Sequence, residues 1–149
     1  MKYRIRILDS SDYDRNYINL MSQLSPIKVQ TITKLQFASW VELVKQNHNH
    51  CIFVIENIEN DLIIASGTLL IEPKLIHNFG FVGHIEDIVV DKSYRGIGLG
   101  KLIISYLVEH AKHLKCYKVI LNSRNEHIKY YKKLGFNKKD TSMSIYFES

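Results

Sequence analysis

The stretch Asp91–Lys101, which reads DKSYRGIGLGK, decides the fold. A β-rich run, Ile85–Val90, precedes it, and apolar residues at helical spacing follow it from Leu99 to Leu114. Its three alternate glycines therefore stand where a strand turns into a helix. Such a turn presents successive backbone N–H groups at the positive end of a helix, which suits a pyrophosphate. Arg95 and the lysine that ends the stretch add positive charge.

Two common phosphate-binding loops do not fit this stretch. A P-loop needs glycine where Arg95 stands and a hydroxyl residue where Leu102 stands, and a dinucleotide loop needs glycine at Lys101. The spacing Arg95-x-x-Gly98-x-Gly100 instead resembles the R/Q-x-x-G-x-G/A loop of the GNAT acetyltransferases.

A second segment carries the same resemblance. Asn125–Phe136, NEHIKYYKKLGF, is similar to the GNAT motif that ends in Tyr-x-Lys-x-Gly-Phe. In that family the tyrosine at the position of Tyr131 hydrogen-bonds the sulfur of CoA. Acyl transfer expels a thiolate, which a phenol can stabilise or protonate. The resemblance therefore implies that Tyr131 is catalytic.

Three further segments resemble the glucosamine-6-phosphate N-acetyltransferases, which serve UDP-N-acetylglucosamine biosynthesis. They are Gly83–Val90, Cys116–Leu121 and Ile71–His77, and the similarity runs from about Ile63 to Phe136 with a weaker trace at Leu24 and Ser25. The resemblance implies transfer of acetyl from acetyl-CoA to the amine of glucosamine 6-phosphate. It also implies a homodimer.

The resemblance assigns two sets of site residues. The residues expected to bind acetyl-CoA are Ile88, Val89, Val90, Arg95, Gly96, Ile97, Gly98, Leu99, Gly100, Lys101, Asn122, His127 and Tyr131. The residues expected to bind the sugar phosphate are Ser25, Lys74, His77, Glu86, Asp87, Tyr117 and Lys118, the last two reaching the site of the other subunit.

The chain departs from the family pattern at four positions. Asn122 and Ser123 stand where the family often has Asp-Cys, and His127 replaces an asparagine of the cofactor motif. Tyr146 stands where an arginine that helps to bind phosphate is expected. The acetyl-transfer interpretation does not depend on these positions, but the sugar-phosphate interpretation loses one cation.

The expected reaction is direct attack of the amine on the thioester. Neither cysteine lies in a motif that would make it a nucleophile. A backbone N–H at Val89 or Val90 would polarise the carbonyl. Glu86 would accept the amine proton, through water or directly, although binding sugar hydroxyls alone is an equal alternative. Tyr131 would protonate the departing thiolate.

Composition limits the other functions. The chain of 149 residues has a net charge of +5, which suits anionic substrates, and no nucleic-acid-binding motif accompanies its basic residues. No apolar run is long enough to span a membrane. Cys51 and Cys116 form no CxxC pair and indicate reduced thiols in a cytoplasmic protein, and no metal site is expected. The alternatives are another amine acceptor, a non-catalytic CoA-binding module and a salt-sensitive nucleic-acid binder.

The order of expected elements is β-α-α-β-β-β-α-β-α-β in one domain over residues 1–149. Strands are expected at Tyr3–Leu8, Cys51–Ile55, Leu62–Ile71, His84–Val90 and Tyr117–Leu121, with final strands at Phe136 and Met143–Phe147. Helices are expected at Ser11–Leu24, from Thr33 to about Val44, from Leu99 onward and at Glu126–Leu134. This order predicts an α/β protein of the GNAT fold, with a mixed, mostly antiparallel sheet flanked by helices.

Overall fold

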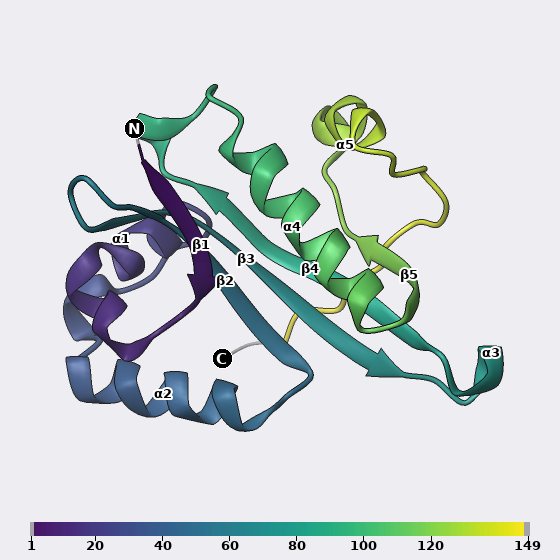
Figure 1. Ribbon diagram of the computed structural model, residues 1–149, viewed down its shortest axis with the longest axis horizontal. Helices are drawn as coiled ribbons and strands as arrows, with labels where there is room; N and C mark the ends of the chain where they lie inside the picture. The colour runs from purple at the N-terminus through teal and green to yellow at the C-terminus, as the bar shows by residue number, and fades with distance from the viewer. Residues whose placement is uncertain (1, 148–149) are drawn as a thin grey trace.

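The computed structural model describes residues 2–147 and shows a twisted sheet with helices on both faces (Figure 1). The first three pairs of neighbouring strands are antiparallel, and the last pair is parallel. The predicted α/β fold with a mixed, mostly antiparallel sheet is therefore confirmed. The strands stand in the order β1 (Tyr3–Ile7), β2 (His50–Asn57), β3 (Leu62–Pro73), β4 (Phe81–Val90) and β5 (Cys116–Leu121).

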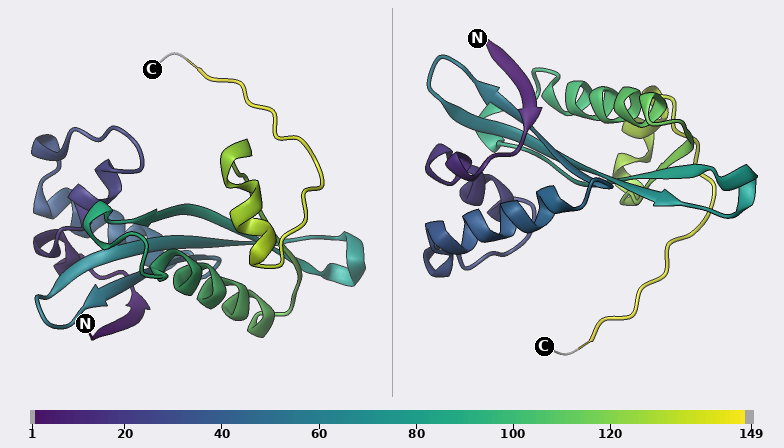
Figure 2. Two further views of the ribbon diagram at one scale, coloured as in Figure 1. Left: turned by 90° about the horizontal axis from the view of Figure 1, so that it is seen from above. Right: turned by 60° about the horizontal axis from the view of Figure 1, so that its bottom comes forward.

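Helices cover both faces of this sheet (Figure 2). α1 (Tyr17–Ser22) and α2 (Lys34–Gln46) lie on one face, and α4 (Leu99–His113) lies on the other. Two short helices complete the set, α3 (Ile76–Phe79) in the β3–β4 connection and α5 (Ile128–Lys133) after β5.

A separate hydrophobic core lies on each face of the sheet. Alternate residues of β2 serve the two cores, because Phe53 and Ile55 pack with α4 whereas Ile52 and Val54 pack with α1 and α2. A strand that is covered on both faces reads as a continuous apolar run, as β2 does.

The prediction of one continuous helix over Ser11–Leu24 is wrong. A 3₁₀ helix over Ser10–Arg15 and the helix α1 are separated by Asn16, whose φ of 73° is left-handed. Asparagine tolerates this conformation better than most residues. The cap of the first turn is Asp9 rather than a serine. By contrast, the capping box of Thr33 that opens α2 is confirmed.

β4 begins three residues before the strand expected at His84–Val90. β4 begins at Phe81 and passes through Gly83. A Cβ on this glycine would lie 3.1 Å from Leu69 and 3.3 Å from the methyl group of Ala111. The glycine therefore allows α4 to pack closely on the sheet.

The two predicted C-terminal strands are also wrong within the described chain. Residues 137–147 form neither helix nor strand and are exposed, and they leave the body of the molecule in Figure 2. Met143 and Tyr146 are each 92% exposed. Phe136 packs at the margin of the α4-side core instead. A strand needs an edge to pair with, and this segment meets none in its own chain. β5 is half-exposed because it is an edge strand of the sheet.

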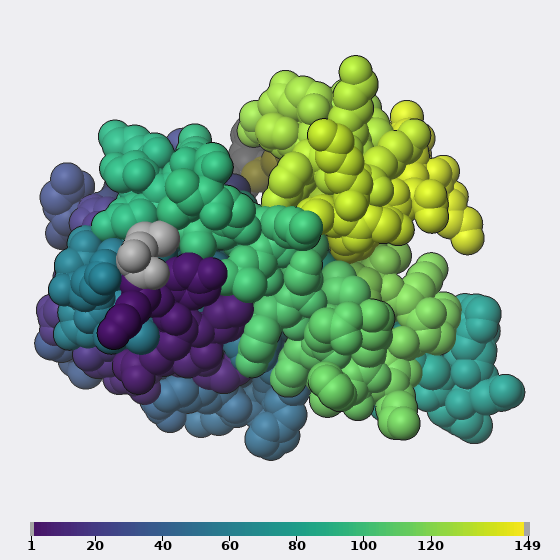
Figure 3. All heavy atoms as spheres, turned by 45° about the horizontal axis from the view of Figure 1, so that its top comes forward, coloured from purple at the N-terminus to yellow at the C-terminus, as the bar shows by residue number. Residues whose placement is uncertain are grey.

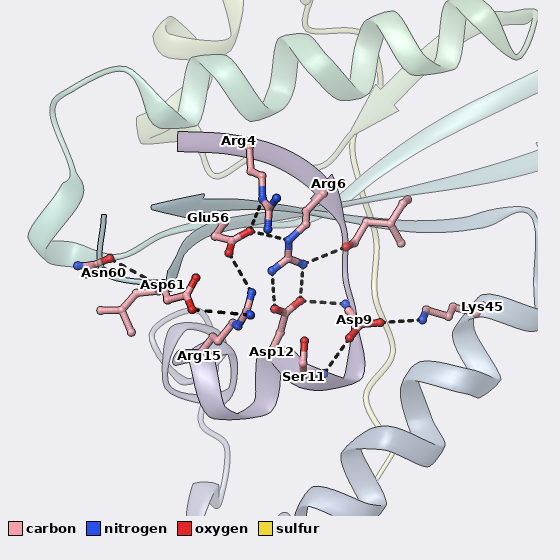
Figure 4. A network of polar contacts seen from close by, with 12 residues as sticks. Arg4, Arg6, Asp9, Ser11, Asp12, Arg15, Lys45, Glu56, Asn60 and Asp61 are labelled. Atoms are coloured by element: carbon pink, nitrogen blue, oxygen red, sulfur yellow. Dashed lines mark hydrogen bonds and ion pairs between the residues drawn. The ribbon is translucent and has the colours of Figure 1, made fainter. Parts of the chain in front are cut away.

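A cluster of ion pairs joins β1, β2 and the first 3₁₀ helix (Figure 4). The Glu56 carboxylate is 1% exposed and accepts hydrogen bonds from Arg4, Arg6 and Arg15 at 2.7–2.9 Å. Arg6 also binds Asp12 through both terminal nitrogens. The hydrogen bond from Arg4 and the further arginine contacts outweigh burial and lower the pKa of Glu56 to about 2.

Candidate active site

A β-bulge shapes the middle of β4. Glu86 stands opposite Thr68 and Val89 opposite Ser66, so two residues of β4 face the single residue Gly67. Asp87, one of the two, has a left-handed φ of 52°. A Cβ on Gly67 would lie 2.6 Å from the Ile88 side chain, so the glycine makes room for the bulge.

The bulge coincides with the place where β4 and β5 part. Their parallel pairing ends at Ile85 and Leu121. Beyond that point Glu86, Val89 and Val90 stay paired with β3, and residues 2–147 place no strand on the other side of the segment Glu86–Val90. The predicted catalytic residue Glu86 and the cofactor residues Ile88–Val90 all lie on this open segment. Figure 3 shows a hollow between the loop after β4 and the atoms of α5.

The loop that follows β4 is fixed at its base by Asp91. The Asp91 N–H donates to the Ile64 carbonyl at 2.9 Å, and its carboxylate accepts from the Ser93 N–H at 2.9 Å. Burial opposes ionisation of this carboxyl group, but hydrogen bonds from Ser93 and Gln23 outweigh it and lower the pKa of Asp91. The Tyr94 hydroxyl gives a second attachment, because it accepts from the Asn60 amide at 3.0 Å.

The glycines of the loop have the geometry that an anion site requires. Gly96 and Gly98 have φ values of 83° and 93°, and a Cβ on either would meet no atom within 4 Å. α4 begins after Gly98 without a capping side chain. The N–H groups of its first turn therefore have no capping side chain at the positive end of a helix of 15 residues.

The other predicted loop residues take different positions. The Arg95 Nε donates to the Val90 carbonyl at 3.0 Å, which folds this side chain along the end of β4. Ile97 and Lys101 are exposed. Leu99 is 3% exposed and belongs to the core, so only its backbone can face a ligand.

Two tyrosines of α5 stand across from the loop. The ring of Tyr131 packs against Tyr130 and Phe136, with centroid distances of 5.3 and 5.9 Å. Burial raises the pKa of Tyr131, which keeps its phenol protonated at neutral pH and able to donate a proton. The predicted cofactor residues Asn122 and His127 are exposed in the connection from β5 to α5.

The predicted acceptor residues fall into two groups. Glu86 and Asp87 lie at the bulge, and α1 lies nearby, since the Asp87 charge adds to burial in raising the pKa of Tyr17 to about 12. Ser25 is exposed beyond the end of α1.

The second group lies at the start of β4. His77 stacks on Tyr117 at 4.1 Å, and the Lys118 Nζ stands 5.8 Å from the centre of that ring. Lys74 is paired with Glu72. At about 3.3 Å per strand residue, Lys118, which pairs with Val82, lies roughly 13 Å from Glu86 along the sheet, and His77 lies farther away, before the start of β4. A single chain therefore does not bring the predicted acceptor residues together.

Three contacts of the site were missed by sequence reasoning. They are the bonds of Gln23 to Asp91 and Lys92, the bond of Asn60 to Tyr94, and the approach of the Tyr130 hydroxyl to Gly100. Each joins residues at least 30 positions apart, so no local pattern signals it.

Residues 2–147 contain no group of three His, Cys, Asp or Glu side chains that could hold a metal ion. No helix in that range has the length and apolarity to cross a bilayer. Cys51 and Cys116 are free.

This geometry agrees with what comparison with known proteins shows. The model of the acetyltransferase (GNAT) family matches residues 17–136, and the chain belongs to this family. Members of the family use acetyl-CoA as the acetyl donor. The predicted family, fold and enzyme class are therefore confirmed.

Individual proteins similar to this chain have more specific names than the family. The chain is 41% identical to glucosamine 6-phosphate N-acetyltransferase 1 of Oryza sativa, over 97% of this chain and 87% of that protein. The crystal structure of glucosamine-6-phosphate N-acetyltransferase from Arabidopsis thaliana is 38% identical, with a TM-score of 0.94 over 99% of this chain and 100% of that one. An acetyltransferase of Trypanosoma brucei is 32% identical, with a TM-score of 0.90 over 98% and 100% of the two chains. The similarity thus extends well beyond the segment Ile63–Phe136.

Proposed function

We propose that this chain transfers the acetyl group of acetyl-CoA to the amine of glucosamine 6-phosphate, giving N-acetylglucosamine 6-phosphate. The observation that carries the proposal is the open segment Glu86–Val90, which runs directly into the glycine loop and whose last residue lies, like the Tyr130 hydroxyl of α5, next to Gly100. The acceptor is supported by the relatives from rice and Arabidopsis, which are similar over nearly their full length.

The residues present fit acetyl-CoA. The pyrophosphate would lie in the open space at Gly96 and Gly98, where backbone N–H groups and Arg95 supply positive charge. The pantetheine would run along the segment Glu86–Val90, whose edge away from β3 lies beyond the pairing with β5 and could pair with an amide-bearing chain. Its thioester would then lie between this segment and Tyr131.

In the reaction the amine nitrogen bonds to the thioester carbon and the carbon–sulfur bond breaks. Glu86 accepts the proton that the amine loses, directly or through a water molecule. A backbone N–H at Val89 or Val90 stabilises the negative charge that develops on the carbonyl oxygen. Tyr131 donates its proton to the departing thiolate and regains one from solvent.

The proposed enzyme is a homodimer. In one chain Lys118 and Tyr117 lie beside the first residues of β4, with Lys118 roughly 13 Å from Glu86 along the sheet, whereas a second copy could bring its own Lys118 and Tyr117 directly to this site. The exposed side chains of Met143, Ile145, Tyr146 and Phe147, each at least 82% exposed, offer apolar surface for such a partner. Sedimentation of the full chain and of a chain ending at Asp140 tests this: the proposal requires a dimer in the first and a loss of dimer in the second.

The proposed acceptor is tested by release of CoA thiol in the presence of glucosamine 6-phosphate, glucosamine, a polyamine or a peptide amine. We expect kcat/KM to be highest for glucosamine 6-phosphate. Equal rates on the two sugars would contradict the phosphate site. Turnover of the peptide alone would show that the acceptor is a peptide amine and not a sugar.

A further inference from the structure

The side chain of Gln23 joins the end of α1 to the base of the glycine loop. Its Nε2 donates to the Asp91 carboxylate at 2.9 Å, and its Oε1 accepts from the Lys92 N–H at 2.9 Å. Both ends of the carboxamide are thus used, on two consecutive residues of the loop. Gln23 is far from the loop in the sequence and belongs to none of the motifs that identify the family.

The partner of this amide is a buried charge. Asp91 is 8% exposed, and a buried carboxylate is destabilising unless hydrogen bonds surround it. One of its oxygens accepts from the Ser93 N–H, which holds the turn leading to Arg95. The other accepts from Gln23. Rotation of the carboxylate would therefore disturb the turn, and Gln23 prevents it.

A fixed base matters for this loop because the residues that follow are conformationally free. A Cβ on Gly96 or Gly98 would meet no atom within 4 Å, and glycine has access to more backbone conformations than any other residue. Ordering these glycines when the ligand binds costs free energy. That cost is lower if the first residues of the loop are already held in the orientation that binding requires.

We propose that Gln23 is a positioning residue of the acetyl-CoA site, which orients the glycine loop through Asp91 and Lys92. The proposal rests on the proposed function, in that the loop is taken to bind acetyl-CoA. Ser25, predicted to face the sugar, follows two residues later, so the same side chain connects the acceptor segment to the cofactor loop.

An exchange of donor and acceptor tests this role. Gln23→Glu removes the donor that faces Asp91 and places two carboxylates together. Asp91→Asn provides a donor but leaves two amide groups competing for the same contacts. In the double variant the amide introduced at position 91 donates to the carboxylate introduced at position 23, while the Ser93 and Lys92 N–H groups keep their acceptors. The shapes of both side chains are preserved.

The measurement is the Kd of acetyl-CoA by calorimetry on each folded variant, without any amine. Each single variant should bind about tenfold more weakly or worse, as expected for the loss of a hydrogen bond to a charged group. The double variant should recover most of that loss. Ser22→Ala is the matched control, since its hydroxyl bonds only the Asn19 carbonyl within α1, and its Kd should equal that of the parent.

Two results would overturn the proposal. One is an unchanged Kd in Gln23→Glu, and the other is a double variant that binds no better than the weaker single variant. If Asp91→Asn does not fold, Gln23→Met decides, because it removes both contacts at similar length and should show the same tenfold loss. Failure of the parent to acetylate glucosamine 6-phosphate would contradict the proposed acceptor and leave this binding result unaffected.

Discussion

The phenol oxygen of Tyr130 occupies the place of the side chain that Gly100 lacks. A Cβ on Gly100 would lie 2.9 Å from that oxygen and 3.7 Å from a methyl group of Val90. The Tyr130 hydroxyl of α5 thus lies close to the first turn of α4. The glycine is needed here for close approach, whereas at Gly98 it is needed for backbone conformation.

This contact predicts a coupling between the two positions. Gly100→Ala in the Tyr130→Phe background should stabilise the protein by up to about 1 kcal/mol, because alanine favours a helix over glycine. In the parent the clash should cancel or reverse that gain. Urea denaturation of the two single variants and the double variant measures the coupling. Additive effects would show that the hydroxyl moves aside freely.

Gly98→Val should abolish acetyl-CoA binding while the protein stays folded. The left-handed φ of 93° costs an L-residue about 1–2 kcal/mol, which a domain of this size tolerates. The new side chain would fill the open space at the start of α4. Circular dichroism tests whether the variant is folded, and calorimetry measures its affinity for acetyl-CoA. An affinity equal to that of the parent would show that the loop does not belong to the cofactor site.

Tyr131→Phe removes only a hydroxyl group from a packed ring. If that hydroxyl protonates the thiolate, kcat should fall by roughly tenfold to a thousandfold with little change in acetyl-CoA affinity. Tyr130→Phe serves as the control on the neighbouring ring and should change kcat far less. A larger fall in kcat in Tyr130→Phe than in Tyr131→Phe would show that Tyr130, and not Tyr131, protonates the thiolate.

Lys118→Ala should reduce turnover of glucosamine 6-phosphate much more than turnover of glucosamine. Charge-assisted hydrogen bonds contribute about 1.5–3 kcal/mol each, so two contacts to the phosphate give a preference of about a hundredfold or more in kcat/KM. Tyr146 in place of an arginine should keep the preference near the lower end. Lys112→Ala is the control, since that lysine pairs with Glu109 on α4. An equal loss on both sugars would assign Lys118 a role unrelated to phosphate.

The Glu56 cluster predicts how stability depends on pH. Its arginine partners lower the pKa of Glu56 from 4.5 to about 2, so folding favours the ionised form. The resulting stabilisation, roughly 3 kcal/mol, should be fully present above about pH 4.5 and lost as the pH falls toward 2. Urea denaturation between pH 7 and pH 2.5 should show a steeper decline for the parent than for Glu56→Gln. Parallel declines would contradict the assignment.

Much of this fold could be predicted because its signals are local. Thr33 opens α2 with a capping box, and Gly135, whose φ of 91° is left-handed, directly follows the helix expected at Glu126–Leu134. The bulge at Asp87 could not be predicted, because the run Ile85–Val90 reads as an unbroken strand. Its left-handed residue is not glycine, and its cause is the fit of Ile88 over Gly67 across the sheet. The apolar segment Met143–Phe147 has strand composition, but composition does not provide a neighbouring strand.

The distance between the two ends of β4 has a genetic consequence. In the proposed dimer each site takes Glu86 from one chain and Lys118 from the other. Chains carrying Glu86→Gln and chains carrying Lys118→Ala would each assemble into impaired dimers. After unfolding and refolding together they would form mixed dimers, in which both lesions fall on one site and the other is intact. Two defective alleles of this protein would therefore complement each other.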